Sequence, residues 1–281
     1  MSRSFRSRLT GVFGYPVDEN PTIVMQEAAF AAAGIDWRYL TLMVKPEALA
    51  AAVEGMRAMN FDGVNLTIPH KTAIIPLLDE ITESAKLIGA VNTVYREGDK
   101  LIGTNTDGKG FVEGLNQRGI KLKNQHLVIL GAGGAARAIA VESALAGCAS
   151  ITIINRNQAR GESLRDLINQ KTEAQADYVE WVPGVRIPAC DILINATNVG
   201  LYPDESCPDI RLDDISSGMI VQDIIPNPAI TPFLKEAEKR GATVFDGLAM
   251  LVYQGAIAFE LWTGVEPSTD IMKQALEEAF A

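Results

Sequence analysis

Histidine and cysteine are scarce in this chain of 281 residues, and their scarcity excludes several kinds of site. The three cysteines, Cys148, Cys190 and Cys207, show no metal-type pairing. Of the two histidines, His126 begins a predicted strand, and His70 begins a predicted helix, where a capping or surface role is the ordinary one. We therefore expect no metal site and no catalytic histidine, and we interpret the cysteines as small core or loop residues.

The chain also has fewer basic than acidic residues and no long apolar run. Lys and Arg number 25 against 35 Asp and Glu, a net charge of −10, and no basic block interrupts the acidic balance. This argues against a nucleic-acid or acidic-membrane partner. No apolar run approaches the roughly 20 residues that a membrane span needs, and the first residues, MSRSFRSRLTGVFG, lack the apolar stretch of a secretory signal. We predict a cytoplasmic monomer or homodimer with a small-molecule substrate.

The first third of the chain alternates between strand and helix patterns. Such alternation predicts an α/β fold with a parallel sheet. A Glu-Gly-Asp turn within residues 90–108 predicts in addition a hairpin that delivers Asn105, Thr106 and Asp107 to a strand end. Strands are predicted over residues 8–14, 37–44 and 61–69, and helices over residues 21–34, 46–60 and 70–81.

A second alternating series begins at Gln125 and has the pattern of a nucleotide-binding domain. After it, the segment LAMLVYQGAIAFELWTG carries aromatic residues at helical spacing, which indicates packing back on the first domain. We therefore predict a substrate domain over residues 1–107, to which residues 247–281 return, and a Rossmann-type NAD(P)-binding domain over residues 108–246.

A glycine-rich turn lies at the start of the second series. LVILGAGGAARA places Gly131, Gly133 and Gly134 between an apolar strand and a helix, where backbone N–H groups and the helix dipole can hold a pyrophosphate. The sixth position of the G-x-G-x-x-G pattern is Ala136, which the variant fingerprint permits. The alternative is an ordinary glycine-rich turn without a ligand, and the strand-to-helix setting favours dinucleotide binding.

The next strand end indicates which dinucleotide binds. An NAD site usually has an Asp or Glu there, but this chain has Asn155, Arg156 and Asn157, followed by Arg160. Because a guanidinium fork matches a phosphate, NADP is favoured over NAD. The alternative is that both arginines are solvated, with Arg160 paired to Glu162 or Glu142, so Arg156 is the better candidate.

A nicotinamide enzyme that oxidises an alcohol needs a group that moves a proton. Lys71 follows the strand GVNLTIP, and Asp107 follows the strand that ends in GTNT, so both are expected at the rim where α/β sheets collect ligands. From the pattern alone, a surface ion pair between Lys71 and Asp107 is the favoured interpretation.

Ordered blocks along nearly the whole chain resemble the shikimate/quinate dehydrogenases. The resemblance implies an α/β substrate domain built from both chain ends around a central Rossmann domain. It also implies interconversion of shikimate and 3-dehydroshikimate with NADP, in aromatic amino acid biosynthesis. The blocks are GVNLTIPHK, IGAVNTV, GTNTDGKGF, GAGGAARA, NRN, NATNVG, NPAITPFL and DGLAMLVYQGAIAFELWTG.

Residue roles follow from the same resemblance. Lys71 would touch the reacting oxygen and transfer the proton, while Asp107 would orient Lys71 and the ring hydroxyls. The substrate contacts would be Asn20, Thr22, Thr67, Asn92 and Gln254, and the cofactor contacts Gly131, Gly133, Gly134, Ala135, Asn155, Arg156, Asn157, Arg160, Thr197 and Gly247.

Two departures from the family pattern lie on the substrate side. Asn20 and Thr22 replace two serines that hold the substrate carboxylate, and Glu27 adds negative charge nearby. Pro226 stands where the family commonly has a tyrosine. The alternatives are therefore a paralogue that uses quinate, an aminoshikimate or another cyclic polyol, or a non-catalytic sensor of NADP or a metabolite.

Overall fold

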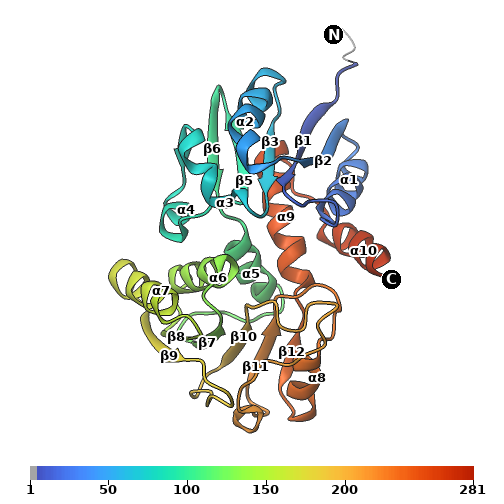
Figure 1. Cartoon of the computed structure of the whole chain (residues 1–281). Coiled ribbons are helices and arrows are strands. Elements are labelled where there is room, and N and C mark those ends of the chain that lie inside the picture. Colours follow the sequence, from blue (N-terminus) through green and yellow to red (C-terminus); the bar gives the residue numbers. More distant parts are fainter. Residues whose placement is uncertain (1–4) are drawn as a thin grey trace. The chain divides into compact units, whose positions relative to one another are not determined.

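The computed structural model describes residues 5–281, which form two compact units. The first contains the described residues up to Thr106 together with Val252–Ala281, and the second contains Asp107–Leu251. Each unit has one six-stranded sheet with helices packed on it (Figure 1). The predicted α/β class is confirmed. The domain boundaries proposed from the sequence remain predictions.

The first unit has a mixed sheet in the order β2-β1-β3-β5-β6-β4. β1 pairs in parallel with β2 and β3, as the alternating pattern predicted, and β5 and β6 form the expected antiparallel hairpin. The ends of β3 and β6 lead into the segments that carry Lys71 and Asp107. The strands are β1 (Arg8–Gly14), β2 (Trp37–Met43), β3 (Gly63–Leu66), β4 (Glu80–Ile81), β5 (Thr93–Glu97) and β6 (Lys100–Thr104).

The helices of this unit follow the predicted order with one correction. The helix expected over residues 70–81 is wrong, because α3 ends at Ala73, a 3₁₀ turn covers Ile75–Leu77, and β4 follows. Pro76 lacks the N–H that a continuing helix needs and restricts the residue before it. The helices are α1 (Thr22–Ala33), α2 (Leu49–Ala58), α3 (His70–Ala73), α4 (Glu83–Ile88), α9 (Leu248–Thr263) and α10 (Thr269–Phe280).

The C-terminal segment returns to the first unit through aromatic contacts. Phe259 of α9 stacks on Phe30 of α1 with ring centroids 5.1 Å apart. The indole N–H of Trp262 donates a 2.9 Å hydrogen bond to the carbonyl of Val94 on β5. The packing predicted from the helical spacing of these aromatics is confirmed, and it holds Gln254 on the same helix in place.

The second unit has an all-parallel sheet in the order β12-β11-β10-β7-β8-β9. The chain runs outward in one direction from β7 and in the other from β10. Their carboxyl ends therefore form the switch point at which open α/β sheets bind ligands. The strands are β7 (His126–Leu130), β8 (Ser150–Asn155), β9 (Gln175–Glu180), β10 (Ile192–Asn195), β11 (Ile220–Asp223) and β12 (Thr243–Phe245).

The helices of the second unit are α5 (Asp107–Asn116), α6 (Gly134–Leu145), α7 (Gln158–Lys171) and α8 (Pro232–Lys239). α5 packs closely on α6, because a Cβ on Gly108 would lie 2.2 Å from the carbonyl oxygen of Ala138. Lys109 of α5 also forms an ion pair of 3.1 Å with Glu142 of α6. This packing fixes α5, and Asp107 at its first position, on the nucleotide unit.

Among residues 5–281, no helix combines the length and the apolar character needed to cross a membrane.

Replacing Gly63 by alanine should lower the free energy of unfolding by about 1–3 kcal/mol, the usual cost of overpacking a core. A Cβ at Gly63 would lie 2.1 Å from the indole nitrogen of Trp262 and 2.2 Å from the carbonyl oxygen of Val94, the two atoms of the bond that anchors α9. Urea denaturation followed by circular dichroism measures the change. Gly55→Ala is the matched control, since its Cβ would meet only Met59 at 3.6 Å and should not destabilise. Equal stability of both variants would contradict the packing described here.

Candidate active site

Lys71 is placed by the backbone that leaves β3. The N–H of Thr67 donates to the carbonyl of Phe13 at 3.0 Å, which fixes the turn after β3 beside β1. The N–H of Val91 donates to the carbonyl of Lys71 at 2.7 Å, so the lysine lies beside the residue that precedes Asn92. The Lys71 side chain is half-buried. One end of the first unit's sheet thus carries Thr67, Lys71 and Asn92 together.

A buried cluster of amides and hydroxyls surrounds Asn92. The Oδ1 of Asn92 accepts a 2.7 Å hydrogen bond from the N–H of Thr106, and its Nδ2 donates at 2.9 Å to the hydroxyl of Thr106. Gln254 of α9 brings its Oε1 to 3.5 Å from the Nδ2 of Asn92 and to 3.4 Å from the hydroxyl of Thr106. Because Asn92 directly precedes β5, Thr106 follows β6 and Gln254 lies on α9, the cluster ties both ends of the hairpin to the distant helix α9.

The hydrogen-bonded network continues through residues that the sequence did not single out. The hydroxyl of Tyr39 donates at 2.7 Å to Oδ1 of Asn65, whose Nδ2 donates at 3.0 Å to the hydroxyl of Thr93. Burial raises the pKa of Tyr39 well above its ordinary value, so its hydroxyl keeps its proton. A polar residue within the apolar run of β3 was the available signal for Asn65, but only pairing across strands shows its partners.

The two residues that replace the family serines are engaged in local bonds. The Oδ1 of Asn20 accepts a 3.1 Å hydrogen bond from the N–H of Thr22. The carboxylate of Glu27 accepts from the N–H of Tyr39, so this acid is turned to the backbone of β2. An amide that accepts through its oxygen still carries two N–H donors on its nitrogen.

The capping or surface role expected for His70 is wrong. His70 is fully buried, not at the surface, and its Nε2 lies 2.7 Å from the carbonyl of Val44. The imidazole thus fastens α3 to the end of β2. Among the described residues, no group of three or more His, Cys, Asp or Glu side chains gathers in a way that could hold a metal ion.

The glycine turn of the second unit is open where a ligand would approach. Gly131 has φ of 110°, a left-handed value that favours glycine, and a Cβ there would meet the carbonyl of Ala196 at 3.0 Å. Gly133 and Gly134, in contrast, have nothing within 4 Å of an added Cβ. α6 begins at Gly134, and Gly133 is its N-cap, which provides no side-chain hydrogen bond. Its first N–H groups can therefore bind an anion.

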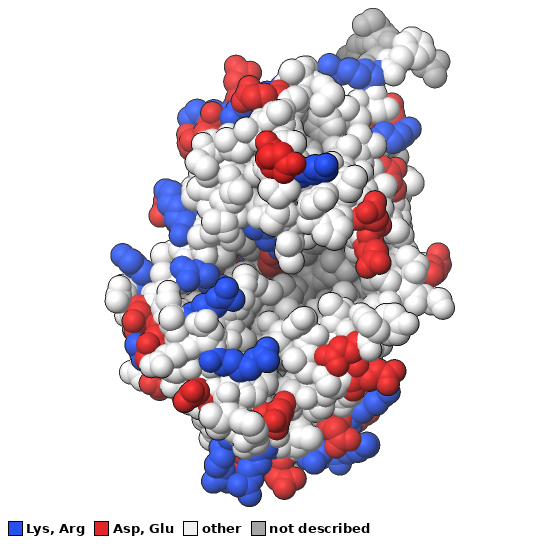
Figure 2. Space-filling view, viewed as in Figure 1, with Lys and Arg blue, Asp and Glu red and all other residues white. Residues whose placement is uncertain are grey.

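The residues after β8 have structural partners of their own. The Nδ2 of Asn155 donates at 2.8 Å to the carbonyl of Asn157, and the Oδ1 of Asn157 accepts from the N–H of Arg160 at 3.0 Å as the cap of α7. Arg156 and Arg160 are both exposed. Several Lys and Arg side chains lie on the face of this unit formed by α6 and α7 (Figure 2).

Two hollows lie near the carboxyl ends of the strands of the second unit. One, of about 540 Å³, is lined by Gly133, Gly134 and Arg160 among others. The other, of about 280 Å³, has Arg156, Trp181 and Thr197 among its walls, and it can accept a flat ring. The two predicted arginines thus line different hollows.

Gly247 and the ends of β10 and β11 form a rigid support. A Cβ at Gly247 would lie 2.2 Å from the carbonyl oxygen of Ile224, so only glycine fits this approach. Asp223 accepts hydrogen bonds from the Nδ2 of Asn195 at 3.1 Å and from the hydroxyl of Thr231 at 2.8 Å. Burial raises the pKa of Asp223. Thr197 donates to Oδ1 of Asn195 at 2.7 Å, which connects it to this group.

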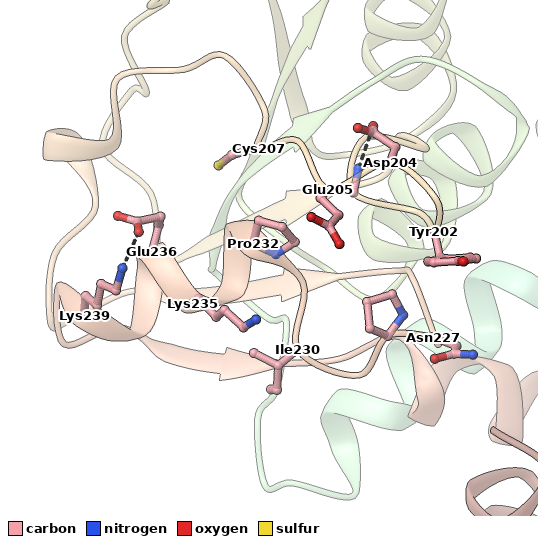
Figure 3. A pocket seen from close by; sticks show the side chains of 12 residues that line it. Tyr202, Asp204, Glu205, Cys207, Asn227, Ile230, Pro232, Lys235, Glu236 and Lys239 are labelled. Carbon is pink, nitrogen blue, oxygen red and sulfur yellow. Dashed lines mark hydrogen bonds and ion pairs between the residues drawn. The ribbon is translucent and has the colours of Figure 1, made fainter. Parts of the chain in front are cut away.

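A larger hollow, of about 790 Å³, lies between the loop after β10 and α8 (Figure 3). Its walls mix both signs of charge, with an ion pair of 2.6 Å between Lys239 and Glu236. Burial raises the pKa of Cys207 in its wall to about 11, so the thiol stays protonated. None of the side chains predicted to bind substrate or cofactor lines it.

The first unit thus carries a cluster of buried amides and hydroxyls, and the second has the parallel sheet and glycine turn of a dinucleotide-binding fold. Three family profiles match this chain in order. They are the shikimate dehydrogenase substrate binding domain over residues 12–94, shikimate/quinate 5-dehydrogenase over 114–202, and the shikimate 5′-dehydrogenase C-terminal domain over 247–277.

Whole-chain relatives agree with the profiles. Shikimate dehydrogenase (NADP(+)) of Desulforamulus reducens is 40% identical, over 98% of this chain and 97% of its own. Two solved structures are similar throughout. The 5-ketofructose reductase of Gluconobacter sp. strain CHM43 is 48% identical with a TM-score of 0.96, over 99% of this chain and 100% of its own. Shikimate 5-dehydrogenase of Thermus thermophilus, solved with NADP(H) and shikimate, is 34% identical with a TM-score of 0.85. The match covers 97% of this chain and 99% of the Thermus chain.

The chain is thus an α/β oxidoreductase with a Rossmann-type unit. It belongs to the shikimate/quinate dehydrogenase family.

Tyr39→Phe should lower the free energy of unfolding at pH 7 by about 1–3 kcal/mol, because Oδ1 of Asn65 would lose its donor in a buried site. This difference should shrink in alkaline solution. The folded pKa of Tyr39 is raised, so above about pH 10 the tyrosine ionises in the unfolded chain while the folded hydroxyl keeps its proton, and the stability that it contributes falls as the pH rises. Urea denaturation at pH 7 and pH 10.5 measures both effects.

Tyr15→Phe is the control for this prediction, since Tyr15 is 41% exposed and its hydroxyl should contribute within about 0.5 kcal/mol. A Tyr39→Phe variant as stable as this control would contradict the network.

Proposed function

We propose that this chain is an NADP-dependent dehydrogenase that interconverts shikimate and 3-dehydroshikimate. The observation that carries the proposal is the buried cluster of Asn92, Thr106 and Gln254 beside Lys71 in the first unit. Amide groups that are already aligned on one another can exchange these bonds for the hydroxyls of a polyhydroxylated ring. The family relatives carry this activity in their names over nearly the same length of chain.

Lys71 is proposed as the proton donor and acceptor at the reacting oxygen. In the direction of ketone reduction, its ammonium group donates a proton to the carbonyl oxygen as the carbon gains hydride, and the neutral amine then recovers a proton from water. Bound NADPH supplies that hydride. In the direction of oxidation, the amine takes the hydroxyl proton. The carbonyl of Lys71 is held by the N–H of Val91, which keeps α3 and its lysine at the end of β3.

Asp107 is proposed to orient the lysine and a substrate hydroxyl. It is the first residue of α5 and follows directly on Thr106, which the cluster holds. A carboxylate accepts hydrogen bonds only, so it selects donors such as an ammonium group or a hydroxyl. Asn20, Thr22 and Thr67 would meet the far side of the substrate.

The second unit fits NADP. The open faces of Gly133 and Gly134 and the uncapped start of α6 would receive the pyrophosphate, with Ala135 in the same turn. The hollow beside Arg156 and Thr197 would receive the adenine ring. Asn155 and Asn157 would act by shaping the loop, since their side chains are bound to it, and Gly247 by permitting close backbone packing.

A second candidate is an NADPH-dependent reductase of a neutral polyhydroxy ketone such as 5-ketofructose. Two observations favour it. Asn20 and Thr22 stand where the family has two serines, and the N–H of Thr22 is bonded to Oδ1 of Asn20, so the groups that would meet a substrate carboxylate differ here from those of the family. The 5-ketofructose reductase of Gluconobacter is 48% identical over the whole chain. Catalysis by Lys71 and Asp107 would be the same for both substrates.

Lys71→Met and Asp107→Asn should each lower kcat by about 100-fold or more, the usual contribution of a positioned acid or base. Binding of NADP, measured by calorimetry, should stay within about twofold of the unaltered protein. Lys86→Met on α4 is the control, because its exposed ammonium group pairs with Glu83. Turnover retained in both variants would contradict the assigned roles.

Initial rates with shikimate, quinate and 5-ketofructose, each with NADP(H) and NAD(H), should distinguish the candidates. Turnover of shikimate supports the first proposal, and turnover of 5-ketofructose alone supports the second. The double variant Asn20→Ser, Thr22→Ser restores two hydroxyl donors and should raise kcat/KM for shikimate by about tenfold. No turnover of any substrate would contradict both candidates and favour a sensor. A cytoplasmic location and the oligomeric state stay predictions.

A further inference from the structure

The hollow of about 790 Å³ in the second unit has the size of a small-molecule site, yet it contains none of the residues proposed to bind shikimate or NADP (Figure 3). Pockets for small molecules usually enclose about 300–1,000 Å³. One wall is the loop that follows β10, with Tyr202 and Glu205, and the other is α8, with Lys235. All of these residues belong to the second unit.

Apolar side chains of this hollow are left open to solvent. Tyr202 is 77% exposed and Ile230 is 43% exposed, and the rings of Pro228 and Pro232 line the same space. Aromatic and proline rings present flat apolar faces, and exposed apolar groups that are rimmed by charge mark a binding site. This part of the hollow suits a flat apolar group of a ligand.

Three of the charged side chains around the hollow already have partners within the protein. Asp204 accepts a hydrogen bond from the hydroxyl of Ser206 at 2.8 Å and another from the N–H of Gly200 at 3.1 Å, and these bonds lower its pKa. Glu236 pairs with Lys239 at 2.6 Å, which lowers the pKa of Glu236. Both carboxylates therefore stay ionised, and their charge is stabilised without a ligand.

Lys235 and Glu205 differ from these groups. Figure 3 shows the ammonium group of Lys235 and the carboxylate of Glu205 directed into the hollow, the first from α8 and the second from the loop after β10. Within residues 5–281, neither side chain forms an ion pair. A ligand that satisfies both would carry a carboxylate for Lys235 and an ammonium group for Glu205.

We propose that this hollow binds a zwitterionic amino acid with a flat apolar side chain. Its carboxylate would lie against Lys235, its ammonium group against Glu205 and its side chain against Tyr202 and the two prolines. A ligand with a single charge would leave one wall without a partner, and a ligand without an apolar part would leave the rings in water. Such an amino acid is neither the substrate nor the cofactor of the proposed reaction, so the inference does not depend on which alcohol the chain oxidises.

Binding of three probes tests the two charges separately. L-phenylalanine carries both charges, 3-phenylpropanoate lacks the ammonium group, and 2-phenylethylammonium lacks the carboxylate. Isothermal titration calorimetry of the full chain, with NADP in excess, should give a Kd for L-phenylalanine of about 1 mM or below and about tenfold weaker binding of each analogue. The excess of NADP keeps the probes out of the cofactor site.

Two variants assign each charge of the probe to its wall. Glu205→Gln should weaken binding of L-phenylalanine about tenfold and leave 3-phenylpropanoate within about threefold, because the latter has no ammonium group to lose. Lys235→Met should likewise weaken L-phenylalanine and leave 2-phenylethylammonium within about threefold. The matched controls are Glu238→Gln and Lys171→Met, since both side chains are exposed in the second unit and lie outside the hollow.

Each other outcome overturns the inference. Equal binding of all three probes would mean that the apolar surface alone attracts them, and an equal loss in the control variants would mean a general effect of charge. No detectable binding of L-phenylalanine at about 10 mM would exclude this kind of ligand from the hollow. Binding that disappears when NADP is added would place the probe in the cofactor site.

Discussion

In the first unit, the main constraint is that buried amide groups must have hydrogen-bond partners. Asn92 and Gln254 are 2% and 7% exposed, and an amide buried without partners would cost several kcal/mol. Each finds its partners only when β5, the segment after β6 and α9 come together, so the same bonds that stabilise the fold also hold hydrogen-bonding groups at the sheet end beside Lys71. Under the proposed function, folding and substrate recognition share this one set of contacts.

The cofactor half obeys a different constraint, which is the close approach of backbones. Gly108, Gly131 and Gly247 each lie where a Cβ would meet a carbonyl oxygen at 3.0 Å or less, while Gly133 and Gly134 face open space. The first group lets helices and strand ends pack closely, and the second leaves room for a ligand. Within the glycine turn, Gly131 therefore permits close packing, whereas Gly133 and Gly134 leave open space for a cofactor.

The residues proposed for catalysis match the family pattern more closely than the residues proposed for substrate recognition. Lys71 and Asp107 keep the family pattern, whereas Asn20 and Thr22 depart from it, and the N–H of Thr22 is bonded to Oδ1 of Asn20. Under the proposed roles, the residues for proton transfer are retained while the residues that would meet the substrate differ. Of the proteins to which the chain is similar, one is named for shikimate and another for 5-ketofructose.

Periodicity and turn residues were enough to predict the alternating elements, the glycine turn, the hairpin and the return of the last helices, because these are local signals repeated along the chain. They failed where a local pattern was interrupted, as at Pro76, and no strand was predicted at β9, although Ala176 and Tyr178 alternate there with the exposed Gln175 and Asp177. The sequence alone determined the fold class, the family and the candidate residues Lys71 and Asp107. Only the tertiary structure decided that Tyr39 and Asn65 extend the polar network and that Arg160 lines one hollow while Arg156 lines another, since these relations depend on side chains that meet across strands and helices far apart in the chain.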